Sequence, residues 1–306
     1  MNNKINFSKI FKVANIFSLL AVLVSILFLF FKGLNYGVDF KGGTLLEIRI
    51  ENKNIQIQDI RSSLNMPELG DVNVKQFGKE GDFLIKFEKN ANENEKFTTD
   101  LKNIISKKIG SAVNFRRVES VGPKVSSELL KQGLTAIILS LAAMLFYIWI
   151  RFEWQFSLGA IIALIHDVII TLGIFSILSF EVNLSIVAAV LTIVGYSMND
   201  TVVIFDRIRE NLLKYSKIST NEISDISINE TLSRTIITSL TTLFALVSIF
   251  ILGGEILKGF SFAMILGVII GTYSSIFVAS TSVLYLNVST TDLIVTKKEE
   301  VDDGMP

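Results

Sequence analysis

The sequence contains no cysteine and only one histidine among its 306 residues. Disulfides and thiolate metal ligands are therefore absent, and a site built from several histidines is excluded within this chain. The chain also lacks an excess of positive or negative charge, because 29 Lys and Arg balance 29 Asp and Glu. No basic surface for nucleic acid is indicated, and we expect neither a metal nor a cofactor nor a nucleic-acid partner.

Apolar residues are abundant, at 50% of the chain with 23 Phe, and they gather in long runs that contain few charges. A run of about 18 or more such residues predicts a membrane-spanning helix. The six predicted transmembrane helices occupy 13–34, 133–150, 156–178, 184–205, 235–252 and 260–286. The sequence therefore predicts an α-helical integral membrane protein, interrupted by a polar block at 35–130.

Basic residues predict the orientation of these helices. Lys4, Lys9 and Lys12 precede the first apolar run, which is too long for a signal peptide and lacks a cleavage site. We expect residues 1–12, a loop at 206–233 and a tail at 287–306 in the cytoplasm, so that both termini lie inside. The polar block is then extracytoplasmic, and residues 131–286 form a five-helix transmembrane bundle.

The polar block has the periodicity of a small α+β domain. Alternating residues predict strands at 44–50, 72–77, 83–87 and 112–118, and helical spacing predicts helices at 57–64 and 97–109. This β-α-β-β-α-β order is that of a ferredoxin-like domain. Nothing in it resembles a catalytic site, so we expect a recognition or lever domain rather than an enzyme.

A glycine-rich segment, GVDFKGGT, connects the first helix to this domain. Gly42 and Gly43 allow a sharp backbone turn, and Asp39 is expected to accept hydrogen bonds from local amides. The segment lacks the lysine spacing of a phosphate-binding loop, so a rigid turn is the preferred interpretation.

An acidic residue, Asp200, stands inside the fourth apolar run. Such a residue costs about 2.5–3.5 kcal/mol on insertion scales and usually marks an ion path or a buried pair. Arg234 opens the fifth run, which crosses in the opposite direction, so both residues are expected at similar depth. We interpret Asp200 as an ion relay and Arg234 as its charge partner or gate. A static buried ion pair is the alternative.

Other polar residues within the apolar runs could support this pair. Asp167 lies on a seam of small residues and is either a relay member or a partner in a helix–helix hydrogen bond. The further supporting residues are Asn199, His166 and Thr238. In the sixth run, the four-residue spacing of Gly267, Gly271 and Ser275 predicts a seam along which a neighbouring helix packs closely.

Six segments carry a resemblance to a known family. They are GVDFKGGT (37–44), VGPKVSSEL (121–129), HDV (166–168), GYSMNDTVVIFDRIREN (195–211), TLSRTIITSLTTL (231–243) and GTYSSIFVAS (271–280). Together they resemble SecF of the SecD/SecF protein translocase family, within the resistance-nodulation-division superfamily, in the same order and over essentially the whole chain.

The resemblance implies a function and a set of partners. Members of this family in the bacterial cytoplasmic (inner) membrane pair with SecD and use the proton motive force, or sodium in some cases, to promote preprotein translocation after the ATP-driven step. Asp200 and Arg234 match the family's essential intramembrane residues, and a further required acid belongs to SecD. Implied partners are SecD, the SecYEG translocon, YajC and YidC, the unfolded preprotein and membrane lipids.

Two other functions compete with this interpretation. Half of a proton-coupled efflux or lipid transporter of the same superfamily would have similar spans but usually carries much larger outer domains. Asp167 and Asp200 could form an intramembrane aspartyl protease dyad, but the usual YD and GxGD contexts are absent from the sequence. We therefore expect a transport protein that is not an enzyme.

Overall fold

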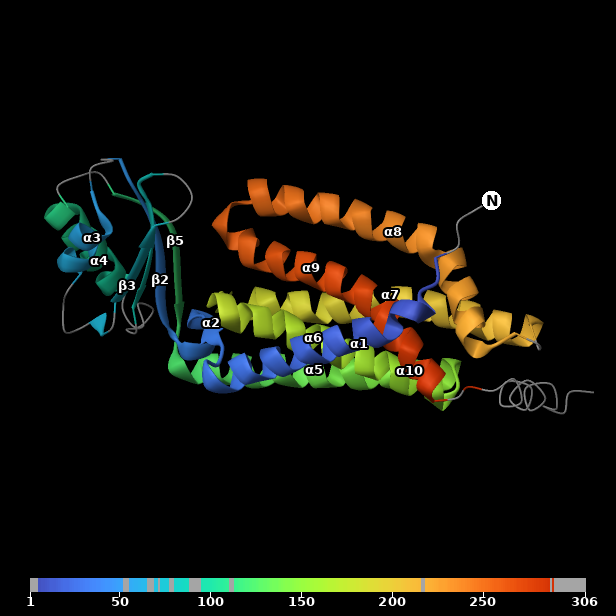
Figure 1. Cartoon of the computed structure of the whole chain (residues 1–306). Coiled ribbons are helices and arrows are strands. Elements are labelled where there is room, and N and C mark those ends of the chain that lie inside the picture. Colours follow the sequence, from blue (N-terminus) through green and yellow to red (C-terminus); the bar gives the residue numbers. More distant parts are fainter. Residues whose placement is uncertain are drawn as a thin grey trace, which may run out of the picture.

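The computed structural model describes residues 5–51, 55–64, 69–70, 72–76, 80–87, 95–109, 113–215, 218–286 and 288. The predicted cytoplasmic tail, apart from Val288, and residues 1–4 of the N-terminal segment lie outside the described residues. Figure 1 shows a bundle of long helices with a small α/β domain at one end.

Six helical segments of the described chain are long and apolar enough to cross a membrane. They are α1 (Ser8–Phe31), α5 (Pro123–Arg151), α6 (Trp154–Leu178), α7 (Leu184–Lys214), α8 (Thr220–Leu252) and a sixth from Ile256 to Tyr285. The sixth comprises most of α9 (Gly254–Ser274), the π-helical turn η3 (Ser275–Ala279) and α10 (Ser280–Tyr285). The predicted fold class is confirmed.

The helix ends differ from the sequence expectation on the side away from the α/β domain. The loop expected at 206–233 is largely helical, because α7 continues to Lys214 and α8 already begins at Thr220. The Ser219 side chain accepts a hydrogen bond from the Glu222 amide and caps α8. The extensions also contact each other, since Asn211 donates to the Ser227 hydroxyl at 2.9 Å. This polar packing has no signature in the hydropathy pattern.

The inserted domain contains β2 (Gly43–Ile50), α3 (Ile57–Ser63), β3 (Val72–Gln76), β4 (Asp82–Phe87), α4 (Glu95–Ile109) and β5 (Val113–Val121). The sheet order is β3-β4-β2-β5 with every neighbouring pair antiparallel, which is the predicted ferredoxin-like topology. Alternate residues such as Leu46, Ile48, Phe83 and Ile85 are buried in one core, as a sheet covered on one face requires. Helices α3 and α4 cover the face away from the bundle (Figure 1).

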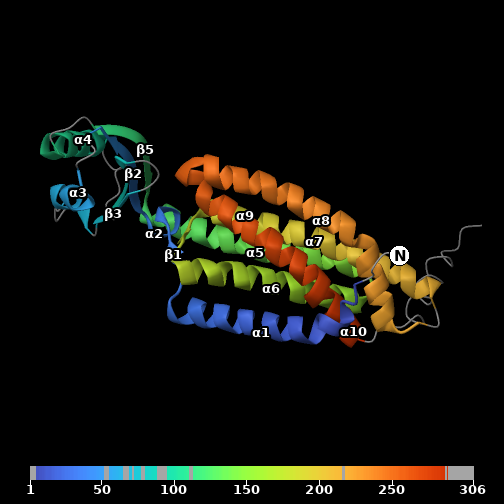
Figure 2. The ribbon, with the colours of Figure 1, turned by 45° about the horizontal axis from the view of Figure 1, so that its top comes forward.

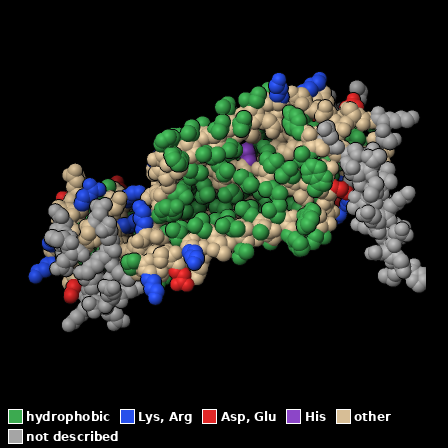
Figure 3. Space-filling view, turned by 90° about the horizontal axis from the view of Figure 1, so that it is seen from below, with side chains coloured by type: hydrophobic (Ala, Val, Ile, Leu, Met, Phe, Trp, Pro, Cys, Tyr) green, Lys and Arg blue, Asp and Glu red, His purple; other side chains and the backbone are tan. Residues whose placement is uncertain are grey.

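The helices of the bundle differ in burial. The apolar segments of α6, α7 and α9–α10 are the most buried, whereas those of α1, α5 and α8 are mostly exposed. Apolar side chains cover the length of the bundle on the face shown in Figure 3, and most charged ones lie toward its two ends. This distribution matches a bundle surrounded by lipid, whose headgroups lie at the level of the charged ends.

Helix α1 packs against α6 along most of its length (Figure 2). The approach is closest at Gly173, where an added Cβ would lie 2.3 Å from the Cβ of Ser25 and 2.8 Å from its Cα. The Ser25 backbone therefore leaves no space for any side chain at this position.

We predict that Gly173→Ala lowers the free energy of unfolding by about 1–3 kcal/mol, the usual cost of overpacking. Thermal or denaturant unfolding of the purified chain in detergent measures the change. Gly195→Ala is the matched control, because nothing lies within 4 Å of a Cβ at that helical glycine. Equal stability of the two variants would contradict the close approach of α1 and α6.

Candidate functional site

Asp167 is the centre of a buried hydrogen-bond network in the bundle. Its side chain is fully buried, and its Oδ2 accepts hydrogen bonds from the hydroxyls of Ser197 at 2.6 Å and Ser274 at 2.8 Å. Its Oδ1 lies 2.9 Å from Nδ1 of His166. One carboxylate therefore joins the three most buried helices, α6, α7 and α9.

His166 contacts Asp167 at one ring nitrogen and Tyr273 at its ring face. Its ring stacks on Tyr273 at a centroid distance of 6.4 Å, and the Tyr273 hydroxyl donates to the carbonyl of Ala14 at 2.7 Å. The buried Nε2 of His166 has no hydrogen-bond partner in the described part of the chain. The ring is thus held at one nitrogen and unsatisfied at the other.

The seam predicted in the sixth span lies against α7. A Cβ on Gly267 would come within 2.2 Å of the Ile193 side chain, and one on Gly271 within 2.9 Å of the Ser197 Cβ. Ser275 donates to the carbonyl of Ser197 at 3.2 Å, across the same contact. These small residues therefore allow α9 to approach the part of α7 that carries the Asp167 network.

The sixth span changes from α-helical to π-helical geometry beside this network. The π-helical turn η3 begins at Ser275, whose hydroxyl is hydrogen-bonded to Thr201 at 2.8 Å. Ser280 donates back to the carbonyl of Ser275 at 3.0 Å. Such turns are rare and occur frequently at functional sites.

Asp200 lies one turn beyond Ser197 on α7 but has a different environment. Its side chain is buried at 4% exposure, and Oδ2 has no hydrogen-bond partner among the described residues. Burying an unpaired charge is costly, so an unpaired acid inside a membrane bundle is a candidate functional group. No hydrogen bond joins the two intramembrane acids in the described part of the chain, and the hydrogen bonds of Asp167 go to Ser197, Ser274 and His166 instead.

Arg234 is exposed on α8 and forms no ion pair with Asp200 in the part of the chain that the structure describes. Thr238, one turn further along α8, donates to the Arg234 carbonyl at 3.0 Å, and Asn199 is exposed on α7. The predicted charge partner thus lies on the neighbouring helix α8 and forms no ion pair with Asp200 among the described residues, which differs from a static buried pair.

Several residues of the site were missed by the sequence reasoning. Ser197 precedes Asp200 by three residues and shares its face of α7, which is a signal that helical periodicity could have supplied. Ser239 on α8 bonds Thr272 on α9 at 2.8 Å and lies 3.4 Å from the Tyr196 hydroxyl. Nothing in the local sequence identifies Ser239, because its role depends on which helices are neighbours.

The glycine-rich segment forms a second constellation at the outer end of α7. Strand β1 (Asn35–Tyr36) pairs in parallel with β6 (Glu181–Val182), in the turn between α6 and α7. The amide of Gly37 donates to the Val182 carbonyl at 2.8 Å. This pairing fixes the start of the inserted domain to the outer end of the bundle.

Among the described residues, Asp39 accepts a hydrogen bond from a distant amide rather than from the local amides expected from the sequence. Its Oδ2 accepts from the amide of Leu184, the first residue of α7, at 2.9 Å. The β1–β6 pairing brings it there, and a helix N-terminus favours a carboxylate because its amides are unsatisfied. The sharp turn is present, since Gly42 and Gly43 have φ of 79° and 109°, which favour glycine.

A charged contact completes the connection between domain and bundle. Lys86 on β4 forms an ion pair with Glu181 on β6. Gly37 lies close by, since a Cβ there would be 2.5 Å from Oε1 of Glu181. Helix α7 thus connects the buried acid to residues that hold the inserted domain.

Two family models match this chain. The one described as "Protein export membrane protein SecD/SecF, C-terminal" covers residues 101–289, and the "SecD/SecF GG Motif" covers residues 27–53, which include Asp39, Gly42 and Gly43. The chain belongs to the SecD/SecF family. The predicted resemblance is confirmed.

Relatives in this family match over almost the whole chain. Protein translocase subunit SecF of Vibrio alginolyticus is 44% identical over 306 residues, covering 99% of this chain and 97% of the relative. Protein translocase subunit SecF of Rickettsia rickettsii is 43% identical over 281 residues, covering 91% of each chain. The relatives are thus named as components of a transport system rather than as enzymes.

Solved SecDF structures share the fold. The crystal structure of SecDF, a translocon-associated membrane protein from Thermus thermophilus, has a TM-score of 0.84 at 34% identity and covers 93% of this chain. A SecDF structure in a super-membrane-facing form has a TM-score of 0.69 at 33% identity and covers 99%. This chain spans only 39% and 41% of those SecDF chains. Family and fold together make it a multi-pass protein of the bacterial inner membrane.

We predict that Asp167→Ala lowers the free energy of unfolding by about 1–3 kcal/mol, because buried hydroxyls lose their acceptor. Thermal unfolding in detergent measures this change. Thr192→Ala is the control, since its exposed hydroxyl bonds only its own helix, at the Ala188 carbonyl. If both variants unfold alike, Asp167 does not hold the helices together.

Proposed function

We propose that this chain acts with SecD in the Sec protein-export machinery and uses the proton or sodium motive force to promote preprotein translocation after the ATP-driven step. The observation that carries the proposal is Asp200, a buried acid with an unsatisfied oxygen in a family of protein-export membrane proteins. An unpaired carboxyl in a membrane bundle is a natural place for an ion to be taken up and released.

The relay depends on the distance between Asp200 and Arg234. In the described arrangement no ion pair joins them, which favours the protonated or cation-bound acid. A movement that brings the guanidinium into contact would favour the ionised acid and release the ion. The arginine cannot itself lose its proton, so the acid alone changes charge. No cofactor is required, because the transported ion is the only ligand of this step.

SecD is the partner that completes the site. Arg234 and Asn199 are exposed on a surface otherwise rich in exposed apolar residues such as Ile237 and Leu240. The chain also spans only 39% of the solved SecDF chain. We expect SecD to correspond to the remainder and to provide a second bundle with further residues of the ion path. SecYEG, the unfolded preprotein, YajC and YidC are the remaining proposed partners. Both termini lie in the cytoplasm in this arrangement.

Ion uptake would reach the inserted domain through α7. The helix carries Asp200 in its centre, and its first turn is held by Asp39, while the adjoining Glu181 is paired with Lys86 of the domain. A rigid helix transmits a shift or tilt along its length. The outer domain would therefore respond to the ionisation state of Asp200.

We predict that Asp200→Asn and Arg234→Met each abolish the gradient-dependent part of export, because the relay needs one group that titrates and one fixed charge. Export of a secreted protein is measured in cells that depend on this chain, at equal membrane levels and with SecD assembly verified. Varying the proton gradient and the sodium concentration identifies the ion.

The controls for this experiment are Asp206→Asn and Arg151→Met. These residues form a 3.2 Å ion pair in which both side chains are nearly half exposed, and Asp206 lies on the same helix as Asp200. They should retain export, because exposed pairs contribute little. Normal export by Asp200→Asn would show that Asp200 is a structural acid and refute the relay.

We predict that Asp39→Ala lowers export more than Asp39→Asn, because only the alanine removes the acceptor for the Leu184 amide. Loss of such a cap costs about 1 kcal/mol. Asp59→Ala is the matched control, since Asp59 accepts from the Gln56 amide at 2.9 Å in α3, away from α7. Equal export by the Asp39→Ala and Asp59→Ala variants would contradict transmission through α7.

A further inference from the structure

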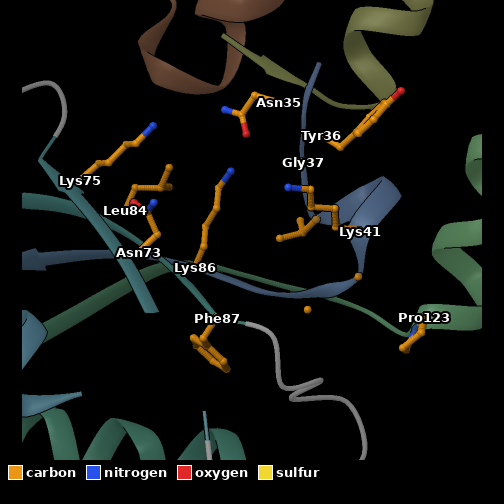
Figure 4. A pocket seen from close by; sticks show the side chains of 13 residues that line it. Asn35, Tyr36, Gly37, Lys41, Asn73, Lys75, Leu84, Lys86, Phe87 and Pro123 are labelled. Atoms are coloured by element: carbon orange, nitrogen blue, oxygen red, sulfur yellow. The ribbon is translucent and has the colours of Figure 1, made fainter. Parts of the chain in front are cut away.

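A pocket of about 540 Å³ lies between the inserted domain and the outer end of the bundle. Its walls come from β1 and the glycine-rich segment on one side and from β3 and β4 on the other (Figure 4). The polar side chains in its lining are those of Lys41, Lys75, Lys86, Asn35 and Asn73. The relay described above does not involve this pocket.

The pocket has an excess of positive charge. Lys86 is paired with Glu181, whereas Lys41 and Lys75 have no hydrogen bond or ion pair in the described part of the chain. Figure 4 shows the side chains of Lys41 and Lys86 extending toward one space, with Lys75 beside them. Three lysines from three elements thus line one pocket, whereas the carboxylates near them are Glu181, which is paired with Lys86, and Asp39, which accepts from the Leu184 amide.

Burial and mutual repulsion disfavour the charged form of the lysines in this pocket. Burial, together with the nearby Lys75 and Lys41, lowers the pKa of Lys86 to about 8, and Asp39 opposes that change. Glu181 is the other charged group facing Lys86. A bound anion would offset both the burial and the mutual repulsion of the lysines.

One wall of the pocket adjoins the outer end of the first span. Asn35 and Tyr36 follow shortly after the end of α1 at Phe31, where the apolar segment ends and lipid headgroups are expected. Leu84 adds apolar surface beside the lysines, and the Phe87 ring points away from them into the core of the domain (Figure 4). The phosphate of a lipid headgroup next to the outer end of α1 would face these lysines.

We propose that this pocket binds a phosphate group, carried by the headgroup of an anionic phospholipid in the outer surface of the membrane. A phosphate offers several acceptor oxygens to which the three ammonium groups can donate at once. Free phosphate shares this chemistry and is the second source to be tested. Such a ligand would connect β3 and β4 to the glycine-rich segment.

The test uses the purified full-length chain in an uncharged detergent. Isothermal titration calorimetry measures binding of dihexanoyl-phosphatidylglycerol, dihexanoyl-phosphatidylcholine and inorganic phosphate. We expect the anionic lipid to bind and Lys75→Gln to weaken it about tenfold or more, the effect of one lost hydrogen bond to a charged group. Lys75→Arg, which keeps the charge, should retain most of the affinity.

Lys107→Gln is the matched control, because this exposed lysine of α4 does not line the pocket. Affinity for the lipid should also fall as the pH rises above about 8, because Lys86 then loses its proton and the phosphodiester itself does not titrate there. The protonated form of Lys86 is expected to bind the anion more tightly than the neutral form, because a nearby negative charge stabilises the charged lysine.

Preference for phosphatidylglycerol over inorganic phosphate would support the lipid as the source. Comparable binding of inorganic phosphate, with the same dependence on Lys75, would support the site with a free anion as its ligand. Absence of binding by both probes, or equal affinity of the Lys75→Gln and Lys107→Gln variants, would overturn the proposal.

Discussion

The cost of placing a carboxyl group in an apolar bundle governs the arrangement of this protein. Asp167 meets that cost with hydrogen bonds from Ser197, Ser274 and His166, and these bonds fix α6, α7 and α9 to one another. The small residues of the sixth span are needed for the same reason, because a larger side chain at Gly271 would separate Ser197 from this network. The close packing of the sixth span against α7 and the hydrogen bonds of Asp167 therefore depend on each other.

Asp200, one helical turn beyond Ser197 on α7, is buried without such hydrogen bonds to one of its oxygens. Its unsatisfied oxygen is buried one helical turn from Ser197, and a buried unpaired charge is costly unless a proton, a cation or a counter-charge relieves it. A satisfied acid stabilises one arrangement, whereas an unsatisfied one favours whichever arrangement or ion relieves it. The π-helical turn that begins at Ser275 makes the backbone of the sixth span irregular where Ser275 donates to the carbonyl of Ser197.

Polar and charged contacts also join the outer end of α7 to the inserted domain. The helix N-terminus attracts Asp39, and the β1–β6 pairing brings Glu181 to Lys86. These contacts leave Lys41 and Lys75 beside an open pocket with unbalanced positive charge. Charged contacts at this junction therefore join the outer end of α7 to the inserted domain, and they border the pocket for which we propose an anionic ligand.

The amino-acid pattern alone predicts the six spans, the ferredoxin-like order of the inserted domain and the presence of acids among apolar residues. Each of these follows from local periodicity or hydropathy, which reports whether a residue meets lipid, water or a core. Only the tertiary structure decided that Asp39 caps α7 rather than its own turn, that Ser197 and Ser274 satisfy Asp167, and that Arg234 stands apart from Asp200. It also decided the start of α8 at Thr220, because polar contacts between α7 and α8 support that extension. Such pairings join residues distant in the chain, and no local pattern encodes which helices become neighbours.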